Sequence, residues 1–89
     1  MKGIITVLGK DHVGIIGTVC TYLSRNDINI LDISQTIVGG YLNMMMIVDL
    51  SIVKKEFTIL VDEIVELGEN MGVAIKMQHE DIFNSMHRV

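Results

Sequence analysis

The chain has 89 residues, of which 49% are hydrophobic and 4% are aromatic, and its formal net charge is −4 at pH 7. This length is that of one domain, so residues 1–89 are expected to fold as a single unit with an aliphatic core. The seven Lys and Arg residues are scattered, which excludes nucleic acid as a main partner, because a phosphate backbone is bound by clustered basic side chains.

The sequence also predicts a cytoplasmic location without membrane contact. Its single cysteine, Cys20, cannot form an internal disulfide, which suits a reducing compartment. The first residues reach a glycine and a polar side chain too soon for a secretory signal. The longest uncharged run, residues 33–48, contains two glycines and is shorter than the ~20 apolar residues of a membrane-spanning helix.

The first half of the chain is predicted to form a strand, a helix and a second strand. Residues 2–9 are rich in β-branched side chains and apolar on both faces, which is typical of a central strand. Residues 13–26 carry an apolar stripe at helical spacing. The stripe consists of Ile16, Val19, Cys20 and Leu23. Residues 28–38 are more polar, which suits a strand at a sheet edge.

The second half begins with a hairpin and then repeats this order. The pair Gly39-Gly40 predicts the hairpin, because a type I′ turn needs a positive φ at both central positions. Residues 41–50 are apolar on both faces and are expected to form another central strand. Residues 57–71 form a predicted helix that ends at Gly72. The last two predicted elements are a strand over residues 73–78 and a short C-terminal helix over residues 80–87.

The order of these elements predicts the fold class. The order βαββαβ indicates an α+β, ferredoxin-like sandwich: a four-stranded antiparallel sheet with two helices on one face and a short C-terminal helix. The first and third strands are central in this topology, in agreement with their apolar faces. The uncovered face would carry Ile4, Leu8, Met45 and Ile47. Because this patch is large for a monomer, we expect the C-terminal segment, a second subunit or both to cover it.

The turn between the first strand and the first helix can be interpreted in two ways. Asp11 stands where an N-cap belongs, with its carboxylate in reach of the Val13 and Gly14 amides. The helix start carries a partial positive charge, and Gly14 lets another group approach the backbone, which together favour binding of a carboxylate or similar anion. Alternatively, the turn is a capped helix start whose glycines pack tightly on a neighbouring strand.

No metal site, cofactor site or catalytic site is predicted. His12 is either a ligand contact or an exposed loop histidine, since Asp11 alone does not complete a set of metal ligands. The cluster of His79, Glu80 and Asp81 with His87 lacks a recognised ligand spacing and is interpreted as a solvated strand end. No nucleophile and base, and no pair of carboxylates, converge at a spacing that would support catalysis.

The combined pattern resembles an ACT domain. The matching segments are Gly9-Lys10-Asp11, Gly14-Ile15, Ile28-Asn29-Ile30 and Ser34-Gln35 before the hairpin. With the order of elements, they extend along nearly the whole chain. The sequence resembles in particular the small stand-alone bacterial ACT-domain proteins. It is also similar to the ACT segments of the glycine cleavage system transcriptional repressor and of formyltetrahydrofolate deformylase.

This resemblance implies regulatory binding of a small molecule, usually an amino acid, at an interface between two ACT domains. In the family, the turn after the first strand supplies backbone amides and the Asn that opens the second strand supplies its side-chain amide. By position, the implied ligand-binding residues are Asp11, His12, Val13, Gly14, Ile15 and Asn29. Many members carry proline just before the glycine, where this chain has Val13, so the turn is less rigid on its own.

The sequence therefore leaves a leading function and an alternative. The leading prediction is a non-catalytic, regulatory domain that binds a small molecule such as an amino acid and acts as a homodimer. A regulated metabolic enzyme or regulator would be a further partner. The alternative is a protein interaction or dimerisation module of the same fold with no small ligand.

Overall fold

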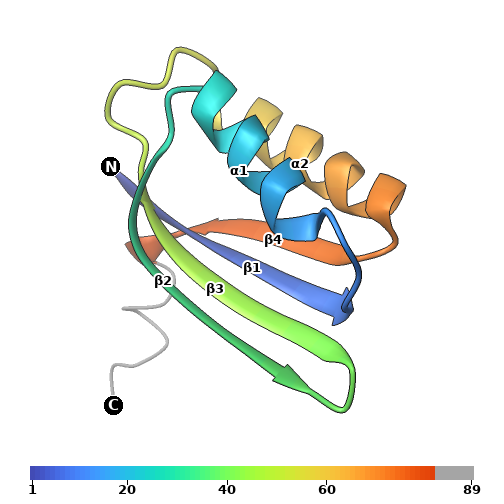
Figure 1. Cartoon of the computed structure of the whole chain (residues 1–89). Coiled ribbons are helices and arrows are strands. Elements are labelled where there is room, and N and C mark those ends of the chain that lie inside the picture. The colour runs from blue at the N-terminus through green and yellow to red at the C-terminus, as the bar shows by residue number, and fades with distance from the viewer. Residues whose placement is uncertain (82–89) are drawn as a thin grey trace.

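A computed structural model describes residues 1–81 and contains six helices and strands (Figure 1). They are β1 (Lys2–Lys10), α1 (Ile15–Arg25), β2 (Asn29–Val38), β3 (Tyr41–Asp49), α2 (Phe57–Met71) and β4 (Ala74–His79). This order confirms the predicted βαββαβ topology. The predicted C-terminal helix over residues 80–87 lies largely outside the described residues. Neither helix within residues 1–81 is long and apolar enough to cross a membrane.

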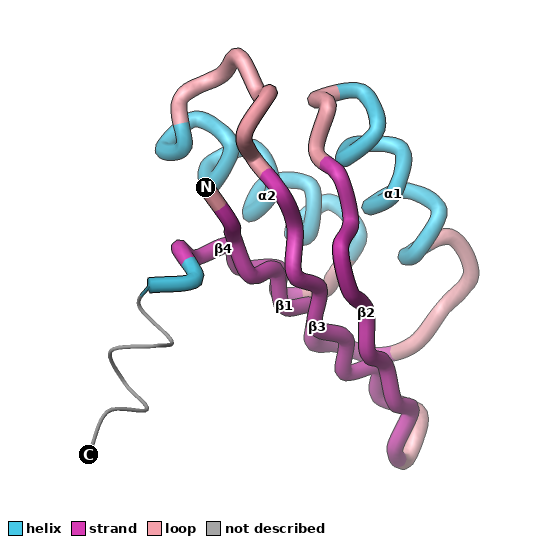
Figure 2. Tube along the Cα trace, turned by 90° about the vertical axis from the view of Figure 1, so that its left-hand side faces the viewer, coloured by secondary structure: helices cyan, strands magenta, loops and turns pink. Residues whose placement is uncertain are grey.

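The four strands form one antiparallel sheet in the order β2-β3-β1-β4, with both helices on one face (Figures 1 and 2). The central positions of β1 and β3 and the edge position of β2 agree with the prediction. Along the sheet, Lys2 of β1 lies opposite Asp49 of β3, and Lys10 lies opposite Tyr41. The hairpin between β2 and β3 turns at Gly39 and Gly40, both with positive φ, as predicted.

The core between the sheet and the helices is aliphatic. Its members from the sheet are Ile5, Val7, Leu42, Met44, Met46, Val48, Ile75 and Met77, and those from the helices are Ile15, Val19, Leu23, Leu60 and Ile64. Met44 and Met46 are buried, whereas Met45 between them is 43% exposed. This alternation follows the two-residue period of a strand, so the methionine run serves packing.

The opposite face of the sheet is partly open, and it carries the four apolar residues predicted for it. Ile4 is buried and Ile47 half-buried, whereas Leu8 and Met45 remain exposed. Some apolar surface is therefore accessible on this face.

Helix α1 differs from the prediction in its start and in its buried stripe. It begins at Ile15, because Gly14 has a φ of 99°, which a right-handed helix cannot include. The buried residues of the helix are Ile15, Val19 and Leu23, whereas Ile16 is exposed and Cys20 half-buried. The predicted stripe was therefore wrong at Ile16. The side of α1 that faces the sheet includes Ile15 in its place.

Two glycines allow β4 to pack closely against its neighbours. A Cβ at Gly68 of α2 would lie 2.7 Å from the Val73 carbonyl oxygen and 2.7 Å from Cγ1 of Ile75. A Cβ at Gly9 of β1 would lie 2.7 Å from Cγ1 of Val73. All three distances are shorter than real Cβ contacts, so α2 and β1 can approach Val73 and the start of β4 this closely only because these positions are glycine.

Candidate functional site

The turn between β1 and α1, residues 11–14, is joined to the β2–β3 hairpin. The Asp11 amide donates a hydrogen bond to the Gly40 carbonyl oxygen at 2.8 Å, and the Thr18 amide donates to the Gly14 carbonyl oxygen at 2.9 Å as the first bond of α1. Gly14 is the N-cap in a left-handed conformation. The turn, the hairpin and the start of α1 therefore meet at one end of the sheet.

The prediction that Asp11 caps the helix was wrong. The N-cap residue is Gly14, and the helix start has no side-chain cap hydrogen bond. Asp11 lies three residues before Gly14, and its amide extends the sheet toward the hairpin instead. The left-handed Gly14 moves the helix start beyond the reach assumed for the Asp11 carboxylate, so no side chain caps the first amides of α1.

The alternative interpretation, in which the glycines pack on a strand, was also wrong at this turn. A Cβ at Gly14 or Gly17 would have no atom within 4 Å. Gly14 is required by its positive φ. Val13 is fully exposed. The backbone of the turn is thus accessible to another molecule from outside.

His12 is tied to the end of α2. Its Nε2 lies 2.8 Å from the carbonyl oxygen of Met71, and its Nδ1 lies 3.1 Å from that of Val13. The hydrogen bonds to Val13 and Met71 raise the pKa of His12 above its ordinary value of 6.5, and the negative charge of Asp11 adds to the rise. His12 is exposed, but it is not a freely moving loop side chain.

Asn29 lies at the opposite end of the sheet from the other predicted site residues. It pairs with Asp49, which pairs with Lys2, whereas the turn follows Lys10. Eight residues of strand separate these ends, which is about 26 Å. Asn29 lines a hollow of about 450 Å³ together with Ser24, Asp27, Ile28, Asp49, Ser51 and Ile52. One copy of the chain thus brings residues 11–15 together but not Asn29.

The side chain of Ile15 is buried in the core, so this residue can offer a ligand only its backbone. Within residues 1–81, no group of three or more His, Cys, Asp or Glu side chains is placed to hold a metal ion. His79 instead stacks on Phe57, with the ring centroids 3.9 Å apart.

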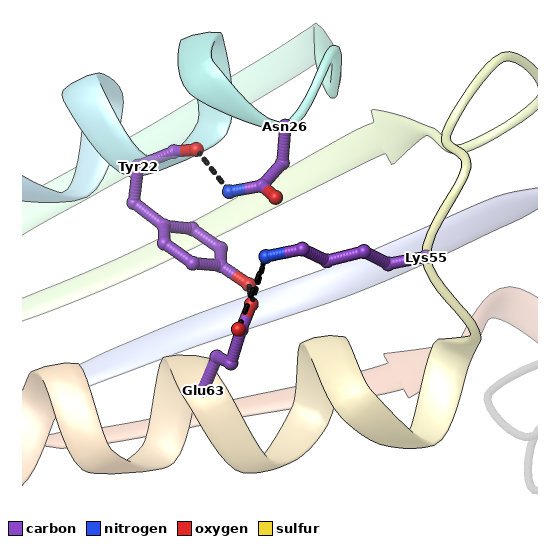
Figure 3. A network of polar contacts seen from close by, with 4 residues as sticks. All are labelled: Tyr22, Asn26, Lys55 and Glu63. Atoms are coloured by element: carbon purple, nitrogen blue, oxygen red, sulfur yellow. Dashed lines mark hydrogen bonds and ion pairs between the residues drawn. The ribbon is translucent and has the colours of Figure 1, made fainter.

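A polar cluster between the two helices was missed from the sequence (Figure 3). The Tyr22 hydroxyl of α1 donates to Oε1 of Glu63 of α2 at 2.9 Å, and Nζ of Lys55 lies 2.9 Å and 3.0 Å from the two Glu63 oxygens. Lys55 and Tyr22 lower the pKa of the Glu63 carboxyl, while burial and Glu63 raise the pKa of Tyr22. Because Tyr22 and Glu63 are 41 residues apart in the chain, no local spacing could have indicated their contact.

The strand β2 forms an outer edge of the sheet (Figure 2). Its residues 31–38 are all exposed. Ile33 and Ile37 lie opposite the buried Met46 and Leu42 and therefore on the helix-facing side, yet they are 45% and 58% exposed. Neither helix covers this margin of the sheet. The unpaired edge therefore combines free backbone groups with apolar side chains.

Comparison with known proteins identifies the family. The sequence profile of the ACT domain family matches residues 3–78. A UPF0237 protein of Bifidobacterium longum is 56% identical over 88 residues, which cover 99% of this chain and 98% of that protein. The solved structure of an ACT domain protein from Streptococcus pneumoniae is similar with a TM-score of 0.83 and 41% identity, and the match covers 98% of both chains.

A formyltetrahydrofolate deformylase from Pseudomonas syringae pv. tomato shares the fold, with a TM-score of 0.79 and 15% identity over 88% of this chain and 27% of that chain. The predicted resemblance to stand-alone ACT-domain proteins and to this segment of the deformylase is confirmed. The chain therefore belongs to the family of ACT domains, which are in general regulatory domains that bind small ligands.

Proposed function

We propose that this chain is a non-catalytic regulatory domain of the cytoplasm that binds an amino acid at the interface of a homodimer. The observation that carries the proposal is the position of the predicted site residues. The turn and Asn29 lie at opposite ends of the sheet, about 26 Å apart, a span far longer than an amino acid. A site that uses both therefore requires a second copy.

Antiparallel pairing of β2 with β2 of a second copy would supply this arrangement. With the two-fold axis near Ile33 and Ser34, the centre of the strand, Asn29 of one copy lies beside the β2–β3 hairpin of the other. The hydrogen bond from Asp11 to Gly40 keeps the turn next to that hairpin. Asn29 of one copy then faces the turn of the other, and the dimer contains two equivalent sites.

The exposed apolar residues along this margin support the same pairing. They are Ile33, Ile37 and Val38 of β2. A fully buried aliphatic side chain contributes roughly 1.5–3 kcal/mol relative to an exposed one. Covering this margin would stabilise a dimer in addition to the backbone hydrogen bonds between the strands.

The two ends of the site have the chemistry that an amino acid requires. Uncapped amides at the start of α1, with the partial positive charge of the helix, favour a carboxylate. The hollow around Asn29 also contains the carboxylates of Asp27 and Asp49, which favour an ammonium group. A zwitterion placed between the two copies would match both ends.

A complementation experiment tests the shared site. Asn29→Ala and Gly14→Val should each abolish the rise in melting temperature that an amino acid causes in the unmodified protein. Ligand at 100 times its Kd adds ~2.7 kcal/mol, and each kcal/mol raises the melting temperature of a domain of this size by ~4–8 °C. Mixed dimers of the two variants retain one intact site, so mixing them should restore binding at one site per dimer.

The control variant is Gly17→Val, which also adds side-chain atoms at an open position near the start of α1 but without a positive φ. It should keep both sites. If the mixed dimers fail to bind while each variant remains folded and dimeric, the site is not shared between copies.

The alternative function, a dimerisation or interaction module without a small ligand, is favoured by the exposed Val13 at the position of the family's proline. It predicts an intact dimer whose melting temperature no amino acid changes. A metabolic enzyme or a regulator would be the further partner under either function.

A further inference from the structure

The imidazole of His12 connects two parts of the chain that are distant in sequence. Its Nδ1 faces the Val13 carbonyl oxygen at 3.1 Å, and its Nε2 faces the Met71 carbonyl oxygen at 2.8 Å, 59 residues away. Met71 is the last residue of α2, where the helix dipole places partial negative charge. The ring therefore joins the candidate ligand-binding turn to the C-terminal end of α2.

Both partners of the ring are carbonyl oxygens, which accept hydrogen bonds and cannot donate. A neutral imidazole carries one N–H group and can satisfy only one of them, whereas the imidazolium donates to both. The charged residues on the segments around the ring are Lys10 and Asp11 before it and Glu69 in the last turn of α2. Asp11 and the helix end favour the cation.

The turn has few other supports. Within residues 1–81, two hydrogen bonds link residues 11–14 to segments distant in sequence: Asp11 to Gly40 and His12 to Met71. Gly14 is left-handed, Val13 is fully exposed, and no side chain caps the helix. The contact of His12 with α2 is thus one of two anchors of the turn. It holds the turn on the side of β4, and the bond from Asp11 to Gly40 holds it on the side of the β2–β3 hairpin.

We propose that His12 is a positioning residue whose imidazolium anchors the turn to α2 and so orients the amides that bind a carboxylate. When the ring loses its proton, one of the two hydrogen bonds is lost, the turn loosens and carboxylate binding weakens. Both ring nitrogens are engaged within the protein, so His12 acts through the turn and not by direct contact with the ligand. The consequence for binding rests on the proposed function, whereas the anchor itself does not.

The first experiment tests the anchor without any ligand. The His12 ring and the amides of Val13, Gly14 and Gly72 are followed by NMR as the pH rises. We expect the ring to titrate above the ordinary histidine value, with the Gly72 amide shifting at the same midpoint. The ¹⁵N relaxation of Val13 and Gly14 should show a more mobile turn above that midpoint, and in His12→Gln the turn should be mobile at every pH. Titration of the ring at its ordinary value, without a change at Gly72, would overturn the anchor.

The second experiment measures binding of the common L-amino acids, used singly, below and above that midpoint. Loss of one hydrogen bond of ordinary strength predicts an affinity about three- to tenfold weaker at the higher pH. His12→Arg keeps the charge and the donors, so its binding should not change over this range. His12→Gln, without a charge, should bind weakly throughout.

The two hypotheses fail differently. If no amino acid binds the unmodified protein at any pH, the proposed function is wrong, and the anchor is judged by the NMR titration and the ¹⁵N relaxation. If an amino acid binds the unmodified protein and His12→Gln with the same affinity at both pH values, the proposed function stands and the positioning role of His12 is wrong.

Discussion

The two outer strands of the sheet occupy equivalent places and have opposite surroundings. On the helix-facing side of β4, Ile75 and Met77 are buried, and Gly68 of α2 lies against the strand. On the same side of β2, Ile33 and Ile37 are exposed, and no residue from 31 to 38 is buried. The two strands differ in burial because a helix packs against β4 and neither helix covers residues 31–38 of β2, although both strands lie at an edge of the sheet. The edge at β4 stabilises the fold of one copy, and the edge at β2 is left accessible to another molecule.

A substitution in the contact between α2 and β4 should lower the stability of the fold more than one in the exposed margin at β2. Gly68→Leu would place side-chain atoms where a Cβ alone already lies 2.7 Å from the Val73 carbonyl oxygen. We expect the free energy of unfolding to fall by about 3 kcal/mol or more, because the helix has to move off the strand. Urea unfolding followed by circular dichroism measures this change. A loss below about 1 kcal/mol would contradict the close packing.

Gly17→Ala is the matched control, since a Cβ there meets no atom within 4 Å. The same measurement should show a gain of up to about 1 kcal/mol, the difference in helix propensity between alanine and glycine.

Substitutions in the exposed margin at β2 should weaken the association of two copies and leave the stability of the monomer almost unchanged. The double substitution Ile33→Lys with Ile37→Lys places charges along the proposed pairing edge, where like charges of two copies would meet. We expect dimerisation to weaken by at least about a hundredfold, with little change in the unfolding of the monomer, because both side chains are already exposed. Sedimentation equilibrium measures the association.

Ala74→Lys adds a charge to an exposed position of β4 and should leave the association unchanged. If the β4 variant dissociates the dimer and the β2 variant does not, the copies pair through β4 and the proposed pairing through β2 is wrong.

The anchor of His12 links the turn to α2 and predicts a pH dependence of stability. The pKa of the His12 imidazole is higher in the folded than in the unfolded chain, so the folded state binds the proton more tightly. The resulting stabilisation is fully present below the unfolded value of ~6.5 and is lost as the pH rises through the folded-state pKa. Thermal unfolding over this range should show the decline in the unmodified protein. The same decline in His12→Gln would assign it to another group.

The smallest effect is expected between the helices themselves. Tyr22→Phe removes the hydrogen bond from α1 to Glu63 but leaves the Lys55 ion pair in place. A single half-buried hydrogen bond predicts a loss of about 1 kcal/mol or less, measured by urea unfolding. A loss of several kcal/mol would mean that this bond, and not the core, holds α1 to α2.

Much of the fold could be predicted because it depends on local patterns. The alternation along β3, the positive φ of Gly39, Gly40 and Gly72, and the bounds of α2 at residues 57–71 agree with the structure. Each follows from a strand period, a helical period or the freedom of glycine, all of which are visible within a few residues.

The details of the candidate site could not be predicted in this way. The start of α1 depends on the φ of Gly14, which moved the helix past Val13, replaced Asp11 as the cap and turned Ile16 outward. The contacts of His12 with Met71 and of Tyr22 with Glu63 join residues 59 and 41 positions apart. Such pairs arise only when the sheet brings the two halves together.

The central place of β1 has a consequence for how the chain folds. This strand is made first, yet its two neighbours are β3 and β4, the latter reaching to His79. During synthesis, the N-terminal strand therefore remains without its full set of partners until the second half has left the ribosome. Pairing over such sequence distances slows folding, and meanwhile the apolar strand is exposed to other nascent chains. The sheet within residues 1–81 is thus completed late, by β4.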